Sequence, residues 1–188
     1  VTALNEYART TEDAITEATE LTIGLDPGES ADWWSGTYTA PRRTMIPLCD
    51  GDWDAICHLT VPAVTDAGMG IHVYSASQAN CLLAEYNYTA GAHKLQRVRG
   101  PGWGTPDSVT AGSGAMWIRI RRRGIALAID YLAGDQAVEP TEATWTQWLV
   151  LNPADWALLG MVIGIHAKHW GALSVAREVA RKWRWVKR

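Results

Sequence analysis

The sequence predicts an all-β protein, an antiparallel β-sandwich that carries an N-terminal helical appendage. Apolar and polar residues alternate in many short segments, and breaks rich in Gly or Pro separate these segments. The chain has 188 residues, of which 47% are hydrophobic and 20% charged, as expected for a globular domain with a real core.

The first 32 residues follow a different pattern from the rest. Small and apolar side chains recur at three- and four-residue steps over residues 3–22, without Gly or Pro, which predicts a helix. Its apolar stripe is thin, so we expect it to pack on the sandwich, on a copy of itself or on a partner. A turn at residues 26–28 ends it. We therefore expect residues 1–32 to be an attachment segment and residues 33–188 to be the sandwich.

From residue 53 the period of the pattern changes to two. Trp53, Ala55 and Cys57 fall on one face, with Asp54 and His58 on the other, which predicts a strand with one buried face. Further strands are predicted at residues 70–74, 82–88, 94–99, 117–122, 125–131, 145–151, 161–167 and 181–187. A tight hairpin is predicted at residues 122–124. Many short strands without helices between them are typical of a sandwich or barrel.

Charge and hydropathy argue against two kinds of partner. Residues 1–32 hold eight acids and one base, and residues 166–188 hold seven bases and one acid. The bases of the second segment alternate with tryptophans as in a strand, and the net charge of the chain is −3, so we expect no nucleic acid. The longest apolar run, residues 157–165, is far shorter than the roughly 20 residues of a membrane-spanning helix, so we expect no membrane partner.

Seven short motifs follow one another within residues 48–188. They are GDWD (51–54), AGMGIHV (67–73), MWIRIRR (116–122), IALAIDY (125–131), WT (145–146), VIGIHA (162–167) and WRWV (183–186). Their order resembles the concanavalin-A-like lectin/glucanase jelly rolls, in the branch found in bacterial carbohydrate-associated proteins and in phage tail and head accessory proteins. The chain departs from that pattern at residues 132–143, which replace the shorter Ser-x-Asp-Gly turn usual before the Trp-Thr pair.

Catalysis is not expected. The resemblance implies that a glycan-cleaving member would carry an E-x-D-x-E strand, because retaining hydrolysis needs two carboxylates about 5 Å apart. After Glu29 the glutamates are Glu85, Glu139, Glu142 and Glu178, and no two of them lie two residues apart. We therefore predict a protein without catalytic residues.

Metal sites are also not expected. Asp50, Asp52 and Asp54 alternate as calcium ligands could, but an EF-hand loop starting at Asp50 would need Gly where Ala55 stands. His166 and His169 lack the paired cysteines or the H-E-x-x-H sequence of zinc sites. An acidic strand edge and ordinary histidines are the preferred interpretations, so we predict no metal and no cofactor.

Aromatic and basic residues form the candidate ligand site. They share faces of three predicted strands, and if these faces coincide they make a platform on which a sugar ring can stack. The alternative is a second core layer or a subunit interface. Trp103, in a Gly-rich loop, is a separate candidate. The complete set is His72, Tyr74, Tyr86, Tyr88, Trp103, Trp117, Arg119 and Arg121.

The function we expect is that of a non-enzymatic structural or accessory protein of a phage virion, decorating the tail or capsid. Its expected partners are other virion proteins or copies of itself, through the N-terminal helix, and host-surface glycans. The acid-rich start is unlike a secretory signal, which favours assembly in the host cytoplasm. The alternatives are a free, extracellular carbohydrate-binding module of a bacterium and, less favoured, a degenerate glycoside hydrolase.

Overall fold

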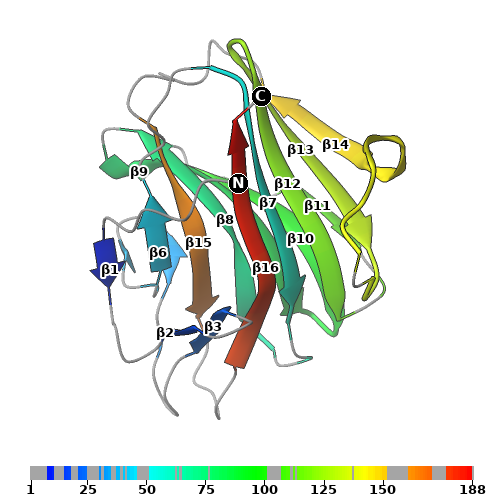
Figure 1. Cartoon of the computed structure of the whole chain (residues 1–188). Helices are drawn as coiled ribbons and strands as arrows, with labels where there is room; N and C mark the ends of the chain where they lie inside the picture. The colour runs from blue at the N-terminus through cyan, green and yellow to red at the C-terminus, as the bar shows by residue number, and fades with distance from the viewer. Residues whose placement is uncertain are drawn as a thin grey trace.

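Two antiparallel sheets packed face to face form the described part of the chain (Figure 1). The computed structural model describes residues 8–10, 15–17, 21–24, 30, 32–34, 37–38, 40, 42–45, 51–61, 63, 65–75, 77–100, 107–110, 112, 114–136, 138–151, 161–170 and 177–187. Among these residues no helix is long and apolar enough to cross a bilayer.

Within the described ranges, each sheet has seven strands. Sheet A contains, in spatial order, β1 (Ala8–Thr10), β6 (Arg42–Met45), β15 (Met161–His169), β8 (Ala67–Ser75), β9 (Ser77–Thr89), β10 (Ala92–Arg99) and β11 (Asp107–Thr110). Sheet B contains β14 (Thr146–Leu151), β13 (Ala126–Ala133), β12 (Ala115–Arg123), β7 (Trp53–Thr60), β16 (Arg177–Lys187), β3 (Leu21–Gly24) and β2 (Ile15–Glu17). A separate hairpin is formed by β4 (Trp33–Trp34) and β5 (Thr37–Tyr38), and a short 3-10 helix, η2, spans Glu142–Thr144.

The core lies between the sheets and is built by period-two alternation. On β7 the predicted apolar face, which includes Trp53, Ala55 and Cys57, points into the core, and each of these residues is 0% exposed. The opposing layer comes from alternate residues of three strands of sheet A. These are Met69, Ile71 and Val73 of β8, Leu82, Ala84 and Tyr86 of β9, and Ile163, Ile165 and Ala167 of β15.

The predicted strands from residue 53 onward are confirmed, and so is the tight hairpin. Strands β12 and β13 pair from Arg123 and Ala126 outward, with Gly124 in the connection. Gly124 has a φ of +55°, a left-handed backbone conformation that glycine adopts without steric cost.

The predicted N-terminal helix is wrong where the structure describes its residues. Residues 8–10, 15–17 and 21–24 form β1, β2 and β3. Strand β1 pairs with β6, and β3 pairs with β16, so both lengthen existing sheets. The helical spacing rested on small residues, whereas sheet pairing supplies backbone hydrogen bonds and suits the β-branched Thr and Ile of these segments. The rest of the predicted helix lies outside the described residues, and the division of the chain at residue 32 stays a prediction.

Tyr86 fills the core, so its removal should destabilise the fold. Replacing Tyr86 by Ala is expected to lower the free energy of unfolding by about 4 kcal/mol, the usual loss for a large aromatic core residue. The matched change at the partly exposed Tyr88 should cost about 1 kcal/mol or less. Urea unfolding measures both, and equal stability of the Tyr86→Ala variant and the parent would contradict this placement.

Candidate ligand pocket

Polar side chains of three neighbouring strands occupy the outer face of sheet A. Ile71, Ala84 and Ile165 point into the core, so the residues beside them on β8, β9 and β15 point away from it. These outward residues are nevertheless buried. They are His72, Glu85, Asn87, His166 and Lys168, none of them more than 5% exposed.

Gly70 lets the side chains of β9 and β15 meet above β8. The strand register places Gly70 between His166 of β15 and Glu85 of β9. A Cβ atom on Gly70 would clash with the carbonyl oxygen of Ala84 and lie 2.7 Å from the Cα atom of Glu85. Without that atom, His166 Nε2 comes within 3.2 Å of Glu85 Oε2. Close approach of the strands therefore requires glycine here.

Lys168 joins the same cluster one row further along the strands. Its neighbours across the sheet are Gly68 and then Asn87. The Nζ atom of Lys168 lies 3.1 Å from Glu85 Oε2 and 3.5 Å from Asp32 Oδ1. One ammonium therefore bridges two carboxylates, one from β9 and one from the segment before β4.

Glu85 is ionised in spite of its burial. Burial disfavours the charged form, but the ammonium of Lys168 and a hydrogen bond from His166 outweigh it, so the pKa of Glu85 lies below its ordinary value. The carboxylate therefore keeps its negative charge at neutral pH.

The β4–β5 hairpin covers part of this face. The ring of Trp33 lies 4.8 Å from that of His72 and 5.6 Å from that of His166, and all three residues are 0% exposed. Trp33 also packs in a small second core with Leu83 and Cys81. Burial raises the pKa of the Cys81 thiol to about 12, so it stays protonated. The hairpin thus closes off the histidine side of the cluster.

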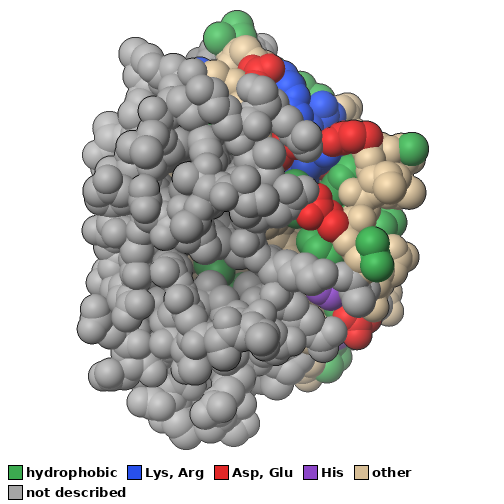
Figure 2. Space-filling model, viewed as in Figure 1, with side chains coloured by type: hydrophobic (Ala, Val, Ile, Leu, Met, Phe, Trp, Pro, Cys, Tyr) green, Lys and Arg blue, Asp and Glu red, His purple; other side chains and the backbone are tan. Residues whose placement is uncertain are grey.

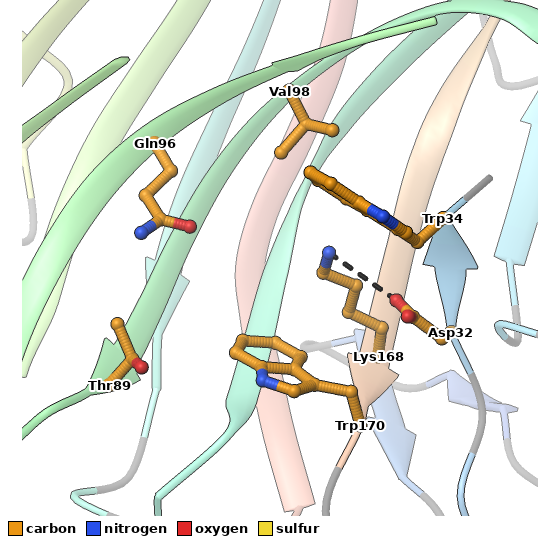
Figure 3. Close-up of a pocket in the computed structure, with 7 residues that line it drawn as sticks. All are labelled: Asp32, Trp34, Thr89, Gln96, Val98, Lys168 and Trp170. Atoms are coloured by element: carbon orange, nitrogen blue, oxygen red, sulfur yellow. Dashed lines mark ion pairs between the residues drawn. The ribbon is translucent and has the colours of Figure 1, made fainter. Parts of the chain in front are cut away.

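The Lys168 side of the cluster opens into a pocket of about 340 Å³. Figure 3 shows the tip of Lys168 between the rings of Trp34 and Trp170, with Thr89 and Gln96 across the cavity. The Nζ atom of Lys168 is 4.8 Å from the ring centre of Trp170 and 5.9 Å from that of Trp34. The pocket therefore combines aromatic walls with polar groups, as sites for small ligands do.

A hydrogen bond holds Gln96 in place on the side of the pocket opposite the tryptophans. The side-chain amide of Asn87 donates to Gln96 Oε1 over 2.7 Å. Asn87 is buried, so it holds the partly exposed Gln96 at the pocket surface.

The structure does not bring the predicted platform together. Tyr86 points into the core, and Trp117, Arg119 and Arg121 belong to sheet B, on the other side of the molecule from the outer face of sheet A. Alternation shows which residues share a face, but it does not show which face is inward or which strands are neighbours. A single platform was therefore the wrong expectation.

The other predicted residues lie apart from one another. His72 is on the outer face of sheet A but beneath Trp33, and the partly buried Tyr74 stacks beside it, with ring centres 5.9 Å apart. Tyr88 contacts His93, with ring centres 4.8 Å apart. Trp103 lies outside the described residues.

The arginines of sheet B are engaged in a structural cluster. Arg119 Nε donates to Asp130 over 2.8 Å, and Arg119 Nη1 donates to both carboxylate oxygens of Glu142 over 2.9 Å. The guanidinium of Arg119 lies 4.6 Å from the ring centre of Trp145. Arg121 Nε also donates to Asp130, over 2.7 Å. Figure 2 shows basic and acidic side chains side by side on this part of the surface. These groups fasten the β13–β14 connection to sheet B.

Trp117 belongs to the same structure. Its indole Nε1 donates to the carbonyl of Gln136 over 2.8 Å, and its ring stacks on His58 with centres 4.7 Å apart. It is 1% exposed and offers no stacking surface.

Of the considered metal ligands, Asp50 lies outside the described residues, and the others do not converge. No group of three or more His, Cys, Asp or Glu residues in the described ranges could hold a metal ion. Asp54 pairs with Arg123 over 2.7 Å, and Asp52 accepts a hydrogen bond from the backbone of Gly124. His166 and His169 are three residues apart on one strand, which places them on opposite faces.

The pocket residues were missed because they come from segments far apart in the sequence. Asp32 and Trp34 come from the N-terminal part, Lys168 and Trp170 from the C-terminal part, and Gln96 from the middle. One signal was available: Glu85 and Asn87 alternate with apolar residues inside a strand, which marks a polar outer face.

Comparisons with solved structures define the fold. A functionally unknown protein from Saccharomyces cerevisiae matches with a TM-score of 0.69 at 15% identity, over 95% of this chain and 94% of that one. The GH43 protein BlXynB from Bacillus licheniformis matches with a TM-score of 0.70 at 14% identity, over 95% of this chain but 35% of that one. An alginate lyase from Klebsiella pneumoniae matches with a TM-score of 0.58 at 10% identity, over 89% of this chain and 81% of that one.

The chain therefore has the concanavalin-A-like jelly-roll fold that the order of its motifs indicated. It spans about a third of the GH43 chain that it matches. No protein-family model and no curated protein sequence matches it.

The ionised Glu85 predicts a specific pH dependence. Because its pKa is lower in the folded than in the unfolded chain, its stabilising effect is complete above about pH 4.5 and is lost as the pH falls through the folded value. Replacing Glu85 by Gln should lower the free energy of unfolding by about 3 kcal/mol at pH 7, because it breaks a buried ion pair. The difference in this free energy between the variant and the parent should shrink towards pH 3.

Urea unfolding between pH 7 and pH 3 measures this difference. Asp135→Asn is the control: the Asp135 side chain is 59% exposed on the other side of the sandwich, 3.8 Å from His58 Nε2, and the change should alter the free energy of unfolding by about 1 kcal/mol or less. A Glu85→Gln difference that stays constant or grows on acidification would show that Glu85 is not held ionised by Lys168.

Proposed function

We propose that this chain is a non-catalytic carbohydrate-binding β-sandwich whose ligand site is the pocket between Trp34 and Trp170. The observation that carries the proposal is the combination of two indole rings with polar groups at one cavity (Figure 3). The apolar face of a sugar ring stacks on an indole, and its hydroxyl groups need hydrogen-bond partners at the ring edge.

The polar lining supplies such partners. The Thr89 hydroxyl and the Gln96 amide can both donate and accept hydrogen bonds, and Lys168 donates. The fold supports the proposal as background, since similar structures include a xylan β-1,4-xylosidase and alginate lyases, which are named for carbohydrate substrates.

The state of the buried groups supports a non-catalytic role. A general acid must hold a proton near neutral pH, whereas the pKa of Glu85 is lowered. Asp32 and Glu85 are both bonded to the single ammonium of Lys168. His72 and His166 are 0% exposed beneath Trp33 and cannot reach a ligand in the pocket.

The setting we propose for this binding protein is a phage virion, on tail or capsid, assembled in the host cytoplasm. Its support is the order of motifs in the sequence, and its expected partners are other virion proteins or copies of the chain. A free extracellular module is the alternative. Light scattering on the purified chain distinguishes the two settings. A virion component is expected to self-assemble, whereas a free module is expected to be a monomer that binds glycans.

Trp170 should carry much of the glycan affinity. Replacing it by Ala is expected to weaken binding about tenfold, because a stacked ring loses its apolar contact, while the midpoint of urea unfolding changes little. Titration calorimetry with xylohexaose, cellohexaose and alginate hexamers measures the affinity. Trp145→Ala, which removes a partly buried indole from sheet B, is the control and should leave affinity unchanged.

The same oligosaccharides test for turnover. No new reducing ends or unsaturated products should appear on incubation with the chain. Unchanged affinity in Trp170→Ala would move the site elsewhere, and turnover that Glu85→Gln abolishes would overturn the non-catalytic proposal.

A further inference from the structure

Charged groups of both signs lie at the pocket, and they differ in how far they are exposed to a ligand. Among the described residues that line it, Asp32 carries a negative charge and Lys168 a positive one. Glu85 lies beneath the pocket and is bonded to the same ammonium. His166 Nε2 also lies 3.2 Å from Glu85 Oε2, so Glu85 has two partners, and both it and His166 are 0% exposed. Asp32 is therefore the carboxylate that faces a ligand in the pocket.

The ammonium of Lys168 is already engaged. Its Nζ atom lies 3.1 Å from Glu85 Oε2 and 3.5 Å from Asp32 Oδ1, and its side chain is 6% exposed. A ligand carboxylate placed against Nζ would lie close to Asp32, because Asp32 Oδ1 is 3.5 Å from Nζ and the Asp32 side chain is 22% exposed at the pocket. Like charges brought together in a partly desolvated site oppose binding.

The remaining hydrogen-bonding capacity suits hydroxyl groups. An ammonium has three N–H donors, and the two carboxylates leave the third available to a ligand oxygen. The pocket lining adds the Thr89 hydroxyl and the Gln96 amide, which can both donate and accept hydrogen bonds. A ligand hydroxyl can donate to these groups as well as accept from them, whereas a carboxylate can only accept.

We infer that the pocket selects uncharged glycans and rejects those built from uronic acids, and that Asp32 is the residue that sets this selectivity. The inference rests on the proposed glycan binding and narrows it to one chemical class. Asp32 can be tested by itself, because its removal leaves the Glu85–Lys168 pair in place.

The test compares acidic oligosaccharides with their own methyl esters, which have the same sugars and linkages without the charge. Hexagalacturonate and hexamannuronate, their methyl esters, xylohexaose and cellohexaose are titrated into the full chain. At least one uncharged probe should bind, and each acid should bind at least about tenfold more weakly than its ester or not at all.

Asp32→Asn should shrink the difference in affinity between each acid and its own ester about tenfold, because the variant removes the charge that repels the acid. Its Oδ1 can still accept the hydrogen bond from the backbone N–H of Trp33, which measures 2.7 Å in the parent. Asp135→Asn removes the same charge on the other side of the sandwich and should alter neither affinity.

An acid that binds as tightly as its ester would overturn the inference, and so would a folded Asp32→Asn variant that discriminates between acids and esters as the parent does. In either case, binding of the uncharged probes would still support the proposed function. If Asp32→Asn fails to fold, the acid and ester titrations of the parent decide alone. A folded parent chain that binds none of the probes would overturn the proposed function, and the inference with it.

Discussion

The contact between the Glu85 carboxylate and the Lys168 ammonium organises the outer face of sheet A. The two side chains come from strands that are not neighbours, and they meet 3.1 Å apart above the intervening β8. Two glycines of β8 make this possible. A Cβ on Gly68 would lie 2.9 Å from the Cβ of Asn87, and one on Gly70 would strike the backbone of β9. The two glycines of β8 therefore leave the room that the Glu85–Lys168 ion pair needs above that strand.

The ion pair also explains why this face is covered on one side and open on the other. A buried pair needs further partners to offset its loss of hydration. His166 and Asp32 supply them, and the β4–β5 hairpin that follows Asp32 places Trp33 over the histidines. Trp34, the next residue, faces the cavity instead. One short hairpin thus closes the histidine side and forms a wall of the pocket.

The sequence was sufficient for the sandwich because strand alternation is a local property. The inward face of β7 and the hairpin at Gly124 follow from neighbouring residues alone. The Arg119–Asp130 pair could also have been found, since the hairpin register places the two residues opposite each other.

The pocket and the N-terminal segment depend on contacts that the sequence does not display. Tyr86 and Glu85 are adjacent on one strand and point to opposite faces, and only the packing of the sheets shows that the tyrosine is inside. Strand β3 is short, and it pairs with β16, a contact that the local sequence does not display. The spacing of small residues, without that partner, indicated a helix.

Gly70 offers the most direct test that close approach of β8 and β9 underlies the site. Gly70→Ala should lower the free energy of unfolding by about 2 kcal/mol or more, because its methyl group meets backbone that cannot rotate away. Gly112→Ala, where no atom of the other described residues lies within 4 Å of the added Cβ, should change this free energy little. Urea unfolding of the two variants beside the parent gives both values. Equal stability of Gly70→Ala and Gly112→Ala would contradict the account.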